Sequence, residues 1–216
     1  MIPPRPLSPT PFLMAQGTLG LRPRPRRGAV LLAALLVACE ARLARGQDDF
    51  GKYSPSSGRF TCELPLDWHA FEEEEPAGFA VHVLGPDDPA GSYRAGIDVH
   101  FVDGGRGAPA GGGSSVPAKQ AIETLRRSDK LTGRQSTPVK RFAVGKGLAR
   151  TFEVWETRFV PAELAPSVSQ VIHHFVAVIE SGDDYYVIRL SSSEEVYVDL
   201  RDVFVRFLKS FRIKGA

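Results

Sequence analysis

Apolar and polar residues alternate along much of the chain after residue 50, and this alternation predicts β-strands. The expected strands are 59–65, 67–72, 79–84, 96–102, 138–144, 147–160, 167–181 and 183–192. The link Ser181-Gly182-Asp183-Asp184 between the last two is typical of a tight hairpin turn. Because hairpins join successive strands, the pattern predicts a mainly antiparallel sheet of about six to seven strands.

Two segments have the periodicity of amphipathic helices, 116–130 and about 193–210. Pro117 suits the first turn of the first helix, where its missing N–H costs nothing. Ser192 and Glu195 have the spacing of a capping box at the start of the second. The expected apolar faces consist of Ala118, Ala121, Ile122 and Leu125 in the first helix and Val196, Leu200, Val203, Phe204, Phe207, Leu208 and Phe211 in the second. Helices packed on such a sheet predict an α+β fold, an α/β/α sandwich.

The apolar run 29–39 follows the basic segment RPRPRR and is shorter than the roughly 20 residues of a membrane-spanning helix. A basic segment before a short apolar run is typical of a secretory signal peptide. The run ends in LVAC and resembles the bacterial lipobox, which implies a lipid-modified Cys39 as membrane anchor. The alternatives are plain secretion, with cleavage before Gln47, and a retained anchor. The expected domains are a signal peptide with lipobox over 1–38, a tether over 39–50 and one domain over 51–216.

The net charge of the chain limits the kinds of partner that it is expected to bind. The chain carries 27 Lys+Arg and 25 Asp+Glu, and removing the five arginines before Cys39 leaves 22 against 25, a net charge of −3. A slightly acidic mature chain does not have the basic footprint of a nucleic-acid-binding protein. Two cysteines exclude a disulfide scaffold. Cys62 alternates with Phe60, which predicts a buried, inert thiol; the alternative is an exposed thiol that pairs with another chain.

The segment from Tyr53 to Phe71 has a glycine-aromatic strand followed by Pro-x-x-Trp, made of Gly58, Phe60, Pro65 and Trp68. The closing segment FVRFLKSFRI carries Phe204, Ser210 and Phe211. Both segments resemble the PsbP-like family, and the resemblance covers roughly 50–214. It implies the α/β/α sandwich shared by photosystem II extrinsic proteins, Ran-binding Mog-type proteins and many bacterial lipoproteins. Such domains are mostly binding or assembly modules and not enzymes. The photosynthetic role does not carry over, because no manganese- or calcium-linked residue set matches.

Histidines suggest one ligand site. On their strands, His82 and the pair Asp98 and His100 lie opposite the apolar positions, so the three cluster if these strands pair in register. Imidazole and carboxylate groups suit zinc or nickel. The alternative is a polar sheet face in contact with solvent. His173 and His174 are adjacent, so they point to opposite faces of their strand and give a weaker signal.

Other polar segments suggest a partner surface. Glu72, Glu73, Glu74 and Glu75 form an acidic run, expected in a turn, that suits a cation or a basic partner, or is simply solvated. Trp155 is either a core residue or an exposed interface anchor. The glycine-rich segment 103–115 predicts a long surface loop. Ser191, Ser192 and Ser193 have no nucleophile elbow around them, so we expect them to cap the last helix.

These observations predict a lipid-anchored, extracytoplasmic binding or assembly module that holds a protein partner and is not an enzyme. No cofactor is expected. The alternative is a periplasmic protein that binds a small ligand or a divalent metal on the sheet face near His82, Asp98 and His100.

Overall fold

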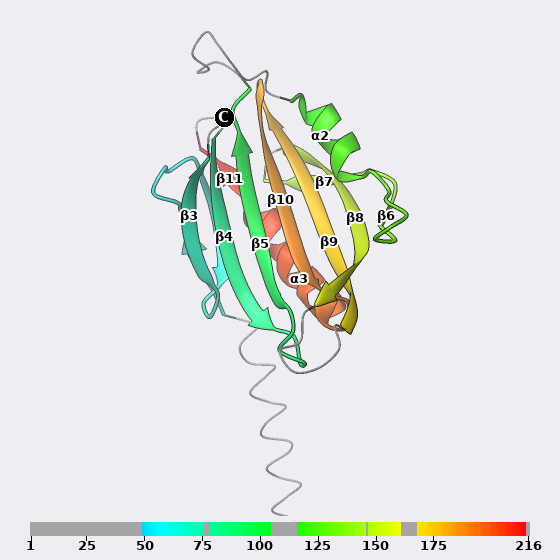
Figure 1. Cartoon of the computed structure of the whole chain (residues 1–216). Helices are drawn as coiled ribbons and strands as arrows, with labels where there is room; N and C mark the ends of the chain where they lie inside the picture. The colour runs from blue at the N-terminus through cyan, green and yellow to red at the C-terminus, as the bar shows by residue number, and fades with distance from the viewer. Residues whose placement is uncertain (1–48, 76–77, 105–115, 146, 161–167, 215–216) are drawn as a thin grey trace, which may run out of the picture. The chain divides into compact units, whose positions relative to one another are not determined.

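The computed structural model describes residues 49–75, 78–104, 116–145, 147–160 and 168–214 (Figure 1). The expected signal peptide, Cys39 and most of the expected tether lie outside the described residues, as does most of the glycine-rich segment 103–115. Within the described ranges, no helix is both long and apolar enough to cross a membrane.

The main sheet has eight strands, and every pairing in it is antiparallel. Its order is β3-β4-β5-β10-β9-β8-β6, and β7 also pairs with β8. The strands are β3 His69–Glu75, β4 Gly78–Asp87, β5 Arg94–Val102, β6 Gln135–Ser136, β7 Lys140–Val144, β8 Gly147–Val160, β9 Val168–Ser181 and β10 Asp184–Ser193. The predicted antiparallel α+β fold is confirmed, with more strands than expected because the two-residue β6 has no detectable alternation of its own.

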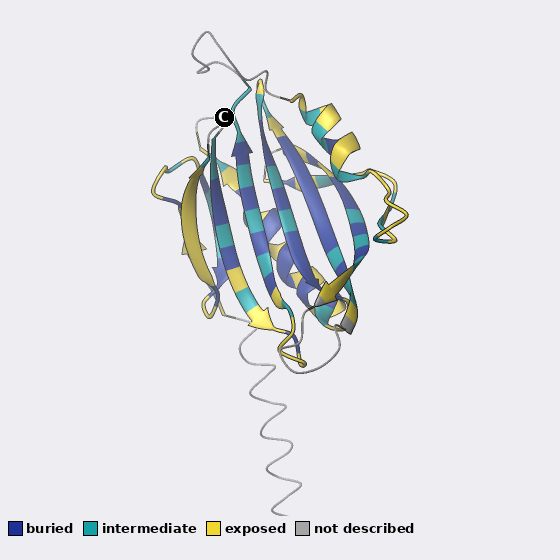
Figure 2. Cartoon of the chain, viewed as in Figure 1, coloured by how far each residue is buried: buried dark blue, intermediate teal, exposed yellow. Residues whose placement is uncertain are grey.

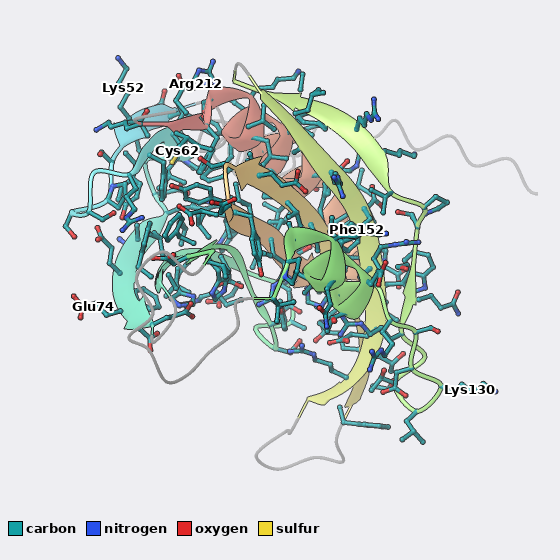
Figure 3. All side chains as sticks on the ribbon, turned by 90° about the horizontal axis from the view of Figure 1, so that it is seen from above. Lys52, Cys62, Glu74, Lys130, Phe152 and Arg212 are labelled. Carbon is teal, nitrogen blue, oxygen red and sulfur yellow. The ribbon has the colours of Figure 1, made fainter. Side chains whose placement is uncertain are left out.

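A second sheet of three strands contains β1 Phe50–Tyr53, β2 Phe60–Pro65 and β11 Arg212–Ile213, in the order β1-β2-β11. The segment 59–65 was expected in the main sheet and instead forms the centre of this small one. Here Phe60 and Cys62 point into the same core as the main sheet, so the alternation is real although the sheet differs. Cys62 is buried, as predicted, and burial raises the pKa of its thiol to about 12 (Figure 3).

Helices cover both faces of the main sheet. α3, Glu194–Ser210, and the small sheet pack on what we call the inner face, where Phe204, Phe207 and Leu208 are fully buried. α2, Ala118–Leu125, packs on the opposite, outer face over Phe152 (Figure 3). The predicted α/β/α layering is therefore confirmed.

The helix ends differ in detail from the prediction. α2 stops at Leu125, before the polar residues that follow it. The N-cap of α3 is Ser193, whose side chain makes no capping hydrogen bond, so the predicted capping box of Ser192 and Glu195 is wrong. The hydroxyls of Ser192 and Ser193 are instead buried without a hydrogen-bond partner among the described residues.

The run Glu72 to Glu75 lies in β3 and not in a turn, which corrects the prediction. β3 pairs with β4 over its whole length, and six of its seven residues are exposed (Figure 2). Four glutamates in succession have low strand propensity, but the hydrogen-bonded ladder to β4 overrides that preference. β3 is thus the terminal strand of the main sheet.

Candidate functional site

The register between β4 and β5 brings the three predicted ligand residues together. His82 lies opposite Asp98, and His100 lies opposite Ala80 on the same outer face. His82 Nδ1 is 2.8 Å from Asp98 Oδ1, and the rings of His82 and His100 are 5.7 Å apart. The predicted clustering of these residues is confirmed.

Each of these three side chains already interacts with another side chain of the same protein. Arg189 donates a hydrogen bond of 2.8 Å to Asp98 Oδ2, and His100 Nδ1 lies 3.0 Å from Glu75 Oε1. Burial raises the pKa of Asp98, but the hydrogen bonds from Arg189 and His82 outweigh it and leave the pKa below its ordinary value. In the described part of the chain, no group of three or more His, Cys, Asp or Glu residues is arranged to hold a metal ion. The guanidinium of Arg189 also opposes a second cation at this position.

Beside this cluster, the outer face holds a cavity of about 160 Å³ with polar walls, which we call the polar cavity. Apolar residues of β4 and β5 complete it. Its polar lining includes Asp98 as well as Tyr93, Arg94, Arg158, His174, Arg189 and Ser191. Three strands supply the arginines: β5 supplies Arg94, β8 supplies Arg158 and β10 supplies Arg189. The cavity thus gathers side chains that are far apart in the sequence.

A buried histidine and serine line this cavity. His174 of β9 lies opposite Ser191 of β10, and His174 Nδ1 is 2.8 Å from Ser191 Oγ. His174 Nε2 lies 3.6 Å from Glu156 Oε1. Burial, together with the positive charges of Arg189 and Arg158, lowers the pKa of His174 to about 4, against a smaller opposing effect of Glu156. The imidazole is therefore neutral at pH 7.

The order Ser191, His174, Glu156 has the residue types of a hydrolytic triad but not its geometry. The separation of 3.6 Å between His174 and Glu156 exceeds hydrogen-bond length. Glu156 is held instead by Arg134 at 2.9 Å and Arg158 at 2.7 Å. A histidine with a pKa of about 4 is also a weak base at neutral pH. The arrangement suits hydrogen bonding to a ligand better than proton abstraction.

Trp155 and His173 lie on the inner face, away from the polar cavity. The Trp155 and His173 rings are 6.3 Å apart and stacked, and His173 contacts Tyr197 of α3 at 4.6 Å between ring centroids. Trp155 is half-buried at the edge of α3. It belongs to β8, five strands from β3 in the sheet order and so about 24 Å from the acidic run. The structure therefore does not bring Trp155 and Glu72–Glu75 into one surface.

The acidic residues of β3 divide between the two faces. Glu73 and Glu75 point to the outer face, where they approach His82 at 3.5 Å and His100 at 3.0 Å. Glu72 accepts hydrogen bonds from the backbone N–H and hydroxyl of Ser56, which lower the pKa of its carboxyl. Glu74 projects from the rim of the domain (Figure 3). A cavity of about 410 Å³ lies along this strand, between it and the Ser56 turn.

Sequence reasoning missed the polar cavity, although one part of it had a signal. The two-residue turn after Ser181 fixes the register of β9 and β10, and that register places His174 opposite Ser191. The convergence of Arg94, Arg158 and Arg189 had no comparable signal, because it depends on the order of strands that are not neighbours in sequence.

A scan against protein-family models finds no match, and a search of the curated proteins finds none. Among solved structures, the chain is similar to cyanobacterial PsbP from Synechocystis sp. PCC 6803, with 14% identity and a TM-score of 0.46 over 76% of this chain and 92% of that one. It is similar to the Ran-binding protein Mog1p of Saccharomyces cerevisiae, with 12% identity and a TM-score of 0.44 over 76% and 95%. It is also similar to LpqN of Mycobacterium tuberculosis, with 13% identity and a TM-score of 0.43 over 76% and 90%. The fold described above rests on this chain's own strands and helices.

Proposed function

We propose that this chain is a non-enzymatic binding module, held by a lipid on Cys39 at the extracytoplasmic side of a bacterial membrane, that binds a protein partner along β3. One observation carries the partner surface: β3 is the terminal strand of the main sheet, and six of its seven residues are exposed. Among the described residues, no strand pairs with its second edge.

A terminal strand offers a row of free backbone N–H and C=O groups. An extended segment of a partner can add to such an edge, with backbone hydrogen bonds giving affinity and side-chain contacts giving specificity. Phe71 is 48% exposed on the outer face of β3 and offers an apolar contact to the incoming segment. The length of β3, seven residues, suits a short extended peptide.

Charge selects the kind of segment. Glu73 is 65% exposed, and Glu72 and Glu74 are exposed beside it. A basic extended segment is favoured at this edge, whereas a second copy of the same acidic strand is repelled. The acidic run therefore supports a heterologous partner with lysine or arginine at alternate positions.

The membrane anchor is the part of the proposal that rests on sequence alone. The apolar run 29–39 and the LVAC segment support processing at Cys39. Mass spectrometry of the mature N-terminus tests the anchor, and we expect an acylated Cys39. A free N-terminus at Gln47 would contradict the anchor. The binding surface needs a separate test.

Site-specific photo-crosslinking of the full chain in cells tests the binding surface. A photoreactive amino acid at Glu74 is compared with one at Val198 of α3, which is 74% exposed and lies on another element. We expect a discrete crosslinked protein from position 74 and none from position 198. Introducing Glu73→Lys into the first variant reduces the crosslink severalfold, because it reverses the charge that attracts the basic segment. Equal crosslinking from both positions, or no effect of Glu73→Lys, would contradict the proposal.

A further inference from the structure

The polar cavity is separate from the β3 edge and supports a second kind of binding. We infer that the polar cavity binds a small oxyanion, the carboxylate or phosphate group of a small molecule. The observation behind this is the convergence of Arg94, Arg158 and Arg189 on one cavity, in whose described lining Asp98 is the single carboxylate.

The arginines have hydrogen-bond donors to spare. Arg94 uses two N–H groups on Asp87, at 2.7 and 2.8 Å, and Arg158 contacts Glu156 at 2.7 Å. Each guanidinium has five N–H donors in a planar fork, so these ion pairs leave donors unused. Guanidinium groups bind carboxylate and phosphate oxygens well because the fork matches two oxygens at once.

Arg189 provides the more specific observation. It donates one hydrogen bond to Asp98 Oδ2 at 2.8 Å, while its Nε is buried and has no hydrogen-bond partner among the described residues. The Arg189 side chain as a whole is 38% exposed, so N–H groups other than the buried Nε can reach an acceptor in the cavity. An oxyanion in the polar cavity is an acceptor of the right charge.

The floor of the cavity is polar but uncharged. The side chain of His174 is 5% exposed, and its imidazole is neutral because burial and the neighbouring arginines disfavour a further positive charge. The positive charges of Arg189 and Arg158, which add to burial in lowering the pKa of His174, also attract an anion. Ser191, hydrogen-bonded to His174 Nδ1, adds a hydroxyl to the floor.

Size limits the ligand. A cavity of about 160 Å³ corresponds to roughly five water molecules, given about 30 Å³ for each in the liquid. This volume accommodates one carboxylate or phosphate group with a few further atoms. A larger molecule would place its charged end in the cavity and leave the rest outside.

Isothermal titration calorimetry of the purified full-length protein at pH 7 and constant ionic strength tests the inference. The probes are inorganic phosphate, acetate and sn-glycerol 3-phosphate, which distinguish a free anion, a carboxylate and the phosphate of a lipid headgroup. We expect saturable binding of at least one probe. Arg158→Gln should weaken it at least tenfold, since it removes a guanidinium from the wall while Glu156 keeps its ion pair with Arg134.

Arg150→Gln is the matched control. Arg150 lies on the same strand, is paired with Glu180, and is about 26 Å from Arg158 along β8. We expect it to bind the probes as the wild type does. Arg94→Gln provides a second test if Arg158→Gln unfolds, which thermal unfolding reveals, and it should also weaken binding. Absence of saturable binding of all three probes, or equal weakening by Arg150→Gln, would overturn the inference.

This test is independent of the partner surface. Glu73→Lys lies on β3, outside the cavity lining, and should leave binding of the probes unchanged. Absence of a crosslink from position 74 in the otherwise unaltered chain, with intact anion binding, would contradict the proposed function and leave this inference standing.

Discussion

The outer face of the main sheet has two halves that differ in what covers them. Beneath α2, Phe152, Val176 and Val178 form an apolar cluster with Ile122 of the helix. On β4 and β5, the equivalent outward positions hold His82, Asp98 and His100. Figure 2 shows that the strands β8 and β9 beside α2 are largely buried, whereas exposure increases toward β3. The same alternation thus serves as a second core in one half and as a polar surface in the other.

The comparison shows why the candidate sites lie where they do. An apolar residue on the outer face is favourable only where a helix covers it, because covering removes its surface from water. The same burial holds the helix in place. Beyond the part of the outer face that α2 covers, the outward positions hold charged side chains, and the polar cavity lies among them. The functional candidates therefore occupy the part of the sheet that stability does not require to be apolar.

Two phenylalanines on the same face test the comparison with the largest expected effect. Phe152 is 2% exposed under α2, whereas Phe71 is half-exposed and stacked on His82. We expect Phe152→Ala to lower the free energy of unfolding by about 3–5 kcal/mol. Phe71→Ala should lower it by about 1 kcal/mol or less. Urea unfolding of both variants measures this, and equal losses would mean that the two halves are not distinct.

The pH dependence of stability sharpens the contrast through His174. Its folded pKa of about 4 lies below its ordinary value, so the unfolded chain takes up a proton near pH 6.5 while the folded chain does not. Stability should therefore fall as the pH is lowered from about 6.5 to about 4, by up to roughly 3 kcal/mol from this residue. Unfolding measured across this window should show a shallower slope in His174→Gln. An identical slope in the two proteins would contradict the assignment.

The smallest effect on stability is expected at β3. Glu73→Val and Glu74→Val together should change the free energy of unfolding by no more than about 0.5 kcal/mol, because both side chains are exposed. The same pair should promote self-association, since it removes the repulsion that keeps two copies of this edge apart. Analytical ultracentrifugation measures the association, and Val198→Glu on α3 serves as a surface control. A double variant that stays monomeric at high concentration would argue against an accessible edge.

Local patterns predicted a large part of the fold. The range predicted for β8 agrees with the structure, and the apolar stripe of α3 is buried as expected. The Gly182-Asp183 turn predicted the β9–β10 hairpin, and alternation placed His82, Asp98 and His100 on one face. These features depend on contacts between neighbours in sequence or on a period of two or 3.6 residues, which a single sequence displays.

The predictions failed where a segment's environment comes from distant parts of the chain. The glutamates of β3 were expected in a turn because their own propensities disfavour a strand, yet β4 supplies the partner that makes them one. β11 has two residues and exists because the end of α3 returns to β2. Neither element has a local pattern strong enough to predict it.

The sequence by itself therefore determined the antiparallel α+β fold, the amphipathic helices and the β9–β10 hairpin, because short-range periodicity and turn chemistry encode them. Only the tertiary structure decided which strand forms the edge, which half of the outer face is covered, and which arginines meet. Those outcomes follow from strand order and helix docking, since β5 pairs with β10 through residues that are more than 80 positions apart in the chain. Burial then decided the protonation state of His174, since its imidazole is neutral where burial and the positive charges of Arg189 and Arg158 oppose protonation.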